Sequence, residues 1–110
     1  MGEKPTRVRI LETGAKATNG DRNVSYGEPI YNLTLAGELK ATIRQHMRRD
    51  MPPGELEALD NVLQKVARCC TGGFHPDNYV DGATYFAIAG EIAETYQLAG
   101  ENTSTSVKVI

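Results

Sequence analysis

The sequence predicts an all-α fold, a compact bundle of about four helices, and three observations support this prediction. Four long stretches carry apolar residues every three or four positions, which is the spacing of one helix face. Clusters of glycine, proline and asparagine separate these stretches, as turn residues do between helices. The 110 residues are 40% hydrophobic and 24% charged, which is typical of one globular domain. We assign residues 1–99 to the helical domain and residues 100–110 to a C-terminal tail.

The first stretch covers about residues 6–18. Its apolar positions at helical spacing are Val8, Leu11 and Ala15. Gly14 costs about 1 kcal/mol relative to alanine inside a helix. A short strand is the alternative, because Val8 and Ile10 alternate with arginines. A polar loop follows over residues 19–29, where an Asn-Gly pair, a second glycine and a proline interrupt regular structure.

The second helix is predicted over residues 29–47 and the third over residues 55–71. Pro29 suits a first helical turn, and the Gly72-Gly73 pair suits the end of the third helix. In each helix one stripe is apolar. The stripe consists of Ile30, Leu33, Ala36, Leu39, Ile43 and Met47 in the second helix, and of Leu56, Leu59, Leu63, Val66 and Cys70 in the third.

The fourth helix, from Pro76 or Asp77 to about Leu98, is apolar over most of its circumference. Such a helix must be covered on several sides, and a small chain has little else with which to cover it. Small residues would let another helix approach closely, namely Gly82, Ala83, Ala89, Gly90 and Ala93. We therefore expect a homo-oligomer.

The tail is polar at first and then alternates between apolar and polar residues, with Val107 and Val109 next to Ser106 and Lys108. Two interpretations remain open. The tail is either a frayed end or a short strand that pairs with another segment or another chain.

The composition and the absence of motifs exclude several classes of protein. A net charge of -2 argues against general attraction to duplex nucleic acid or anionic lipid. No apolar run approaches the roughly 20 residues that span a membrane, and the N-terminal residues lack the apolar stretch of a signal peptide. Cys69 and Cys70 are adjacent and are the only cysteines, so we expect a reducing cytoplasm and packed thiols. The common phosphate-loop, dinucleotide and zinc motifs are missing.

The segment from Lys65 to Tyr85 contains polar residues that simple packing does not explain. Lys65 and Arg68 lie on the side of the third helix opposite its leucines. Asn78 falls within the apolar arc of the fourth helix, and Asp81 lies at its edge, where a carboxylate is costly without a cation, a metal or several donors. Because a short Gly-Gly turn joins the two helices, we expect an antiparallel hairpin that brings these residues together.

Two interpretations of this polar cluster remain. In the first, Arg68 forms a structural ion pair with Asp77 or Asp81, while Asp77 and Asn78 cap the helix. In the second, the cluster is a pocket for a ligand that contains phosphate. The cations bind phosphate oxygens, the amide and the carboxylate bind base, sugar or metal, and a tyrosine stacks on the ligand. The candidate residues of this pocket are Arg22, Tyr26, Lys65, Arg68, Asn78, Asp81 and Tyr85.

Three segments resemble an uncharacterised family of small phage and prophage proteins. They are ILETGAKATNGDRNVSYGEPIYNL, LDNVLQKVARCCTG and HPDNYVDGATYFAIAGEI, within about residues 9–93. The residues that match the motifs of the family are Gly20, Asp21, Arg22, Tyr26, Gly27, Lys65, Arg68, Asp77, Asn78, Asp81 and Tyr85. The resemblance implies a small helical protein in the cytoplasm of a bacterial host cell.

A more distant resemblance is to the MazG-like all-alpha nucleotide pyrophosphohydrolases, and it implies an oligomeric enzyme that depends on magnesium. Those enzymes hold metal with a pair of acids on each of two helices. Asn78 and Asp81 match the second pair, so an amide replaces one acid. Asp77 and Asp81 would then hold the metal, and the first pair is Lys65 and Arg68, or else Glu57 and Asp60. This departure puts hydrolysis in doubt more than nucleotide binding.

Three functions are therefore open, and the sequence leaves undecided whether the chain is an enzyme. The first is binding of a nucleotide or a nucleotide-like signal without a cofactor, by which a phage could sequester a host-defence messenger. The second is magnesium-dependent nucleotide hydrolysis. The third is inhibition of a host protein complex through a helical surface.

Overall fold

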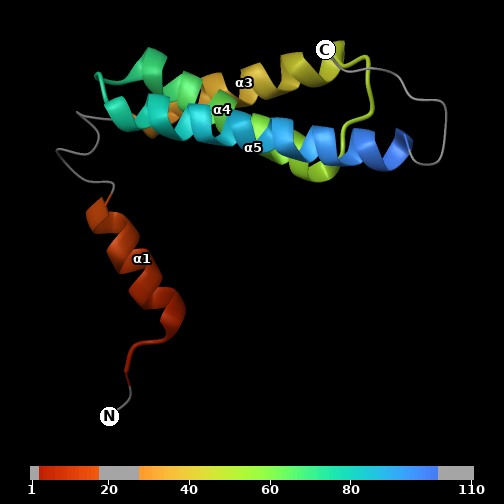
Figure 1. Ribbon diagram of the computed structural model, residues 1–110. Coiled ribbons are helices and arrows are strands. Elements are labelled where there is room, and N and C mark those ends of the chain that lie inside the picture. Colours follow the sequence, from red (N-terminus) through yellow and green to blue (C-terminus); the bar gives the residue numbers. More distant parts are fainter. Residues whose placement is uncertain (1–2, 18–27, 102–110) are drawn as a thin grey trace.

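The computed structural model describes residues 3–17 and 28–101, and this part of the chain contains four α-helices and no strand (Figure 1). The helices are α1 (Thr6–Ala17), α3 (Pro29–His46), α4 (Pro53–Thr71) and α5 (Pro76–Glu101). The predicted all-α fold with about four helices is confirmed, and the first stretch is a helix rather than a strand. Residues 19–27 of the predicted loop and the strand alternative for the tail fall outside the described residues, and Pro29, the last residue of that loop, begins α3.

Proline and glycine set the ends of the helices, as local sequence predicts. Both α3 and α4 begin with a proline in the first turn, Pro29 and Pro53. The residue before each proline is not helical, since Glu28 is extended and Pro52 has a ψ angle of 145°. At the end of α4 the backbone N–H of Gly72 donates to the carbonyl of Arg68 over 3.1 Å. The fourth helix continues past Leu98 to Glu101, so it includes the first residues assigned to the tail.

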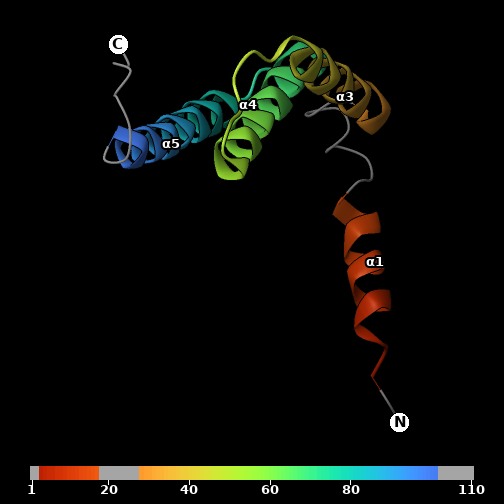
Figure 2. The same cartoon turned by 90° about the vertical axis from the view of Figure 1, so that its right-hand side faces the viewer.

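The helix α4 lies between α3 and α5, which both pack against it (Figure 2). The pairing of α4 with α5 is the more extensive of the two, and these helices form the predicted hairpin. By contrast, α1 lies apart from the other three helices in both views and contains no buried residue (Figures 1 and 2). The packed unit therefore contains three of the four predicted helices.

Small residues form the contact between α4 and α5. A methyl group added to Gly54 would lie 3.3 Å from Cδ1 of Ile92, and one added to Gly82 would lie 3.7 Å from Cβ of Lys65. These two contacts show an antiparallel register in which the start of α4 meets the later part of α5. The buried apolar residues of the described chain are all alanines, namely Ala36, Ala58, Ala67 and Ala89.

The leucine stripe of α4 is not the side that meets α5. No leucine of this stripe is buried, and Val66 remains 42% exposed. The polar side of the helix, which carries Lys65, faces α5 instead. Packing along this side is possible because Gly54, Ala58 and Gly82 are small enough for the two backbones to approach. Within the described ranges, no helix is long and apolar enough to cross a membrane.

Candidate functional site

The predicted polar cluster centres on an ion pair between Lys65 and Asp81. The Nζ atom of Lys65 lies 3.3 Å from Oδ2 of Asp81. The lysine side chain is only 16% exposed, because α5 passes over its stem at Gly82, whereas the aspartate side chain is 50% exposed. Asp81 thus has the cationic partner that its position requires, and that partner is Lys65 rather than Arg68.

Arg68 and Asn78 occupy the corresponding positions one helical turn nearer to the Gly72-Gly73 turn. Asn78 is 4% exposed, and its backbone N–H donates to the carbonyl of His75 over 3.1 Å. In the part of the chain that the structure describes, the Arg68 guanidinium has no hydrogen bond or ion pair, and no buried side-chain nitrogen or oxygen lacks a partner. The hairpin therefore brings a paired cation, a second cation and a buried amide to one end of the α4–α5 contact.

The remaining predicted residues fall in three different settings. Tyr85 is partly buried in α5, one turn after Asp81, so it lies beside the cluster. Asp77 is exposed in the first turn of α5. Arg22 and Tyr26 lie outside the described residues. Among the described residues, no group of three or more histidine, cysteine, aspartate or glutamate side chains could hold a metal ion, so Asp77 and Asp81 lack a third acid.

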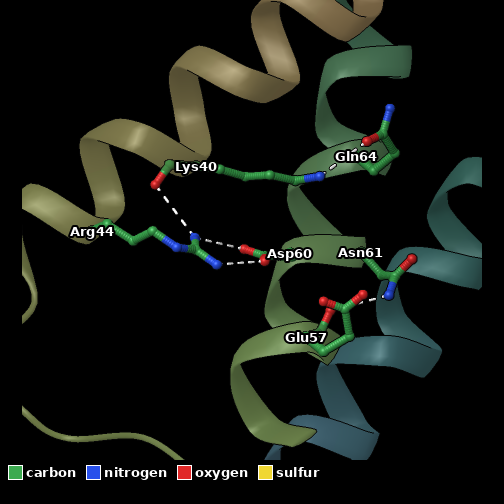
Figure 3. A network of polar contacts seen from close by, with 6 residues as sticks. All are labelled: Lys40, Arg44, Glu57, Asp60, Asn61 and Gln64. Atoms are coloured by element: carbon green, nitrogen blue, oxygen red, sulfur yellow. Dashed lines mark hydrogen bonds and ion pairs between the residues drawn. The ribbon is translucent and has the colours of Figure 1, made fainter. Parts of the chain in front are cut away.

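A second polar network joins α3 to α4 (Figure 3). The guanidinium of Arg44 donates to both carboxylate oxygens of Asp60, over 3.0 and 2.7 Å, and Nζ of Lys40 donates to Gln64 over 3.2 Å. The hydrogen bond to Asp60 raises the pKa of Arg44 above its ordinary value. Asp60, considered above as a metal ligand, is thus already engaged by a cation.

The neighbouring acid Glu57 has a different setting. Its carbonyl accepts a hydrogen bond from the amide of Asn61 over 3.0 Å (Figure 3). Sequence reasoning missed the network between α3 and α4, since Arg44 and Asp60 belong to different helices and no local pattern connects them.

Two further contacts were not predicted. Glu55 is buried, 4% exposed, and the guanidinium of Arg49 donates to its carboxylate. Hydrogen bonding with the Cys69 thiol raises the pKa of Tyr79 above its usual value of 10.0. The Tyr79 ring also lies 5.9 Å from the ring of Phe74, at 38°. The adjacent cysteines are not packed as the sequence predicted, because Cys69 is only partly buried and Cys70 is exposed.

Comparison with known proteins identifies a family but no activity. Searches of curated proteins and of solved structures found no match. The family described as Domain of unknown function (DUF6378) matches the chain over residues 9–93, which contain α3, α4 and most of α1 and α5. Because this match spans most of the chain and includes the whole polar cluster, the protein belongs to the DUF6378 family.

Proposed function

We propose that this protein binds a nucleotide or a nucleotide-like molecule through its phosphate, at the end of the α4–α5 hairpin near the Gly72-Gly73 turn. The observation that carries the proposal is the unengaged guanidinium of Arg68 beside the buried amide of Asn78, within the described residues. An arginine presents a planar set of donors that matches phosphate oxygens. The side-chain amide of Asn78, a residue that is 4% exposed, can add a hydrogen bond to the same ligand.

The ion pair of Lys65 with Asp81 does not prevent this binding. Because half of the Asp81 side chain is exposed, the pair resembles a surface ion pair, which is worth about 0–1 kcal/mol. A hydrogen bond between a charged donor and a phosphate is worth about 1.5–3 kcal/mol. Lys65 can therefore exchange its carboxylate partner for a phosphate oxygen at little net cost. Arg22, Tyr26 and Tyr85 complete the proposed site, with the tyrosines stacking on a base.

Binding without hydrolysis has more support than the magnesium-dependent alternative. Magnesium chemistry on phosphates requires several oxygen ligands in one place. Asp81 instead faces a lysine, Asp60 faces an arginine, and Asp77 stands exposed at the start of α5. The donor set of the described residues thus fits a phosphate anion better than a metal cation.

The proposed role follows from binding alone. A small phage protein that holds a nucleotide signal would remove a host-defence messenger from the bacterial cytoplasm. The same reasoning proposes that the protein acts as a homo-oligomer, because the described chain buries alanines but no larger apolar side chain. Inhibition of a host protein complex is the alternative role if no small ligand binds.

Calorimetry tests the proposal with nucleoside triphosphates, ADP-ribose derivatives and cyclic oligonucleotides, each with and without magnesium. We expect at least one of them to bind without magnesium and to remain intact. Arg68→Ala should weaken its binding by about tenfold or more, which corresponds to one lost charged hydrogen bond.

The matched control is Arg48→Ala, since Arg48 is exposed and, within the described residues, donates only to the carbonyls of His46 and Met47. This control should leave the affinity unchanged. Absence of binding by every compound would contradict the proposal, and release of pyrophosphate only with magnesium would favour the hydrolase.

A further inference from the structure

The helix α5 carries two apolar stripes side by side, and α4 occupies one of them. The occupied stripe consists of Asn78, Gly82, Tyr85, Ala89 and Ile92, which are buried or partly buried. The second stripe consists of the residues one position further on, namely Tyr79, Ala83, Phe86, Gly90 and Ala93. All of these except Ala93 are exposed, with Tyr79 at 58% and Phe86 at 64%. A methyl group added to Gly90 would meet nothing within 4 Å.

This second stripe is continuous with the uncovered side of α4. The stripe borders α4, because each of its residues follows directly after a residue of the occupied stripe, and Tyr79 interacts with the Cys69 thiol of α4. On the same side of α4, Val66 is 42% exposed and Cys70 is exposed. The two antiparallel helices α4 and α5 thus present one apolar face. A second hairpin packed on this face would complete a four-helix bundle.

We propose that a second copy of this chain covers the face, with α5 packed antiparallel against the partner's α5 around a two-fold axis at Phe86. This inference rests on the proposed homo-oligomer and names its interface. Residues 79, 83, 86, 90 and 93 repeat at the alternating four- and three-residue steps of helices that pack side by side. A two-fold interface must also be self-complementary.

The stripe meets this requirement in the proposed register. About an axis at Phe86, each Tyr79 ring faces the small side chain of Ala93 on the other copy, and each Ala83 faces Gly90. Large residues meet small ones at the ends, the small pairs let the backbones approach, and the two Phe86 rings meet at the centre.

The charges of α5 leave this stripe clear for a second copy. The helix α5 contains five acids and no basic residue, but Asp77, Asp81 and Glu91 lie away from the stripe at 100° per residue, and Glu94 borders it.

Sedimentation and light scattering of the full-length protein test the assembly. We expect a dimer whose dissociation constant rises by at least about thirtyfold in Phe86→Glu, because a central aromatic anchor is replaced by a charge. The matched control is Val80→Glu, which places the same charge at a 61% exposed residue on the outer side of α5 and should remain dimeric. Circular dichroism confirms that both variants are folded. A monomeric wild-type protein would overturn both the homo-oligomer and this interface.

Disulfide crosslinking tests the register when Cys69 and Cys70 are replaced by serine. Only a residue near the two-fold axis approaches its own copy, so Phe86→Cys should form a covalent dimer on oxidation and Val80→Cys should not. A dimer in which Phe86→Cys fails to crosslink and Phe86→Glu has no effect overturns the interface but leaves the homo-oligomer standing. A folded monomer in which α1 protects the thiol of the Phe86→Cys variant from alkylation would show that α1 is the occupant and would also overturn the interface.

Discussion

The Nζ atom of Lys65 lies 3.3 Å from Oδ2 of Asp81, and this ion pair connects α4 to α5 at the centre of the predicted polar cluster. Its two members differ in exposure, since the lysine is 16% exposed and the aspartate 50%. The exposed carboxylate can therefore separate from the lysine at little cost. Under the proposed function, Asp81 competes with the bound anion for Lys65.

Asp81→Asn should raise the affinity for pyrophosphate, used as a probe, by up to about fivefold. The substitution removes the competing negative charge and retains a polar group of the same shape, and the ion pair is worth no more than about 1 kcal/mol. Calorimetry at low salt measures the change. In a magnesium-dependent hydrolase the same variant would lose pyrophosphate release from nucleotides, so unchanged binding together with lost turnover would contradict the binding proposal.

Arg49→Ala should lower the free energy of unfolding by about 1–3 kcal/mol, because it leaves the Glu55 carboxylate, 4% exposed, without its cation. Urea unfolding followed by circular dichroism measures the difference. The matched variant is Arg49→Ala combined with Glu55→Gln, which removes the buried charge as well and should recover part of the loss. If Arg49→Ala alone is as stable as the wild type, the pair has no structural role.

Gly37→Ala should stabilise the protein by about 0.5–1 kcal/mol. Gly37 lies inside α3, and a methyl group added there would meet nothing within 4 Å, so only the helix propensity changes. Gly54→Ala should gain less, because its methyl group would lie 3.3 Å from Cδ1 of Ile92 and must displace the end of that side chain. Thermal unfolding compares the two variants, and a larger gain for Gly54→Ala would show that the α4–α5 contact is looser than described.

The Tyr79 phenol should titrate at a higher pH than a free tyrosine, because it hydrogen-bonds with the Cys69 thiol. Because the pKa of Tyr79 is higher in the folded state than its unfolded value of 10.0, the protonated phenol stabilises the fold below pH 10.0. This stabilisation is lost as the pH rises through the pKa of the folded state. The free energy of unfolding should therefore decrease above about pH 10. NMR of labelled tyrosine measures the titration, and Cys69→Ala should return the pKa of Tyr79 toward its ordinary value.

The positions of the helices were predictable because their causes are local. A proline in the first turn of α3 and of α4, a glycine pair after α4 and a three- to four-residue apolar spacing each act within a few residues. The predicted bounds of residues 29–47, 55–71 and 76–98 accordingly lie within a few residues of the observed ones. The separation of α1 from the other helices was not predictable, because helical spacing shows which side of a helix is apolar but not whether anything covers it.

The composition of the candidate site was partly predictable in the same sense. The Gly-Gly turn predicts a hairpin, and a hairpin brings Lys65 and Arg68 near Asn78 and Asp81. The choice of Lys65 over Arg68 as the partner of Asp81 depends on the rotation of α4 about its own axis, which no local pattern specifies. The pair of Arg44 with Asp60 between α3 and α4 was not predictable for the same reason.

The amino-acid sequence by itself determined where the four helices begin and end and which residues could form a polar cluster, because turn residues and helical periodicity act over short range. The tertiary structure decided which side of α4 meets α5. Gly54, Ala58 and Gly82 allow close approach along the polar side, so packing there turns Lys65 toward Asp81 and leaves Val66 42% exposed. That choice depends on the fit between two surfaces, which is a property of the folded chain.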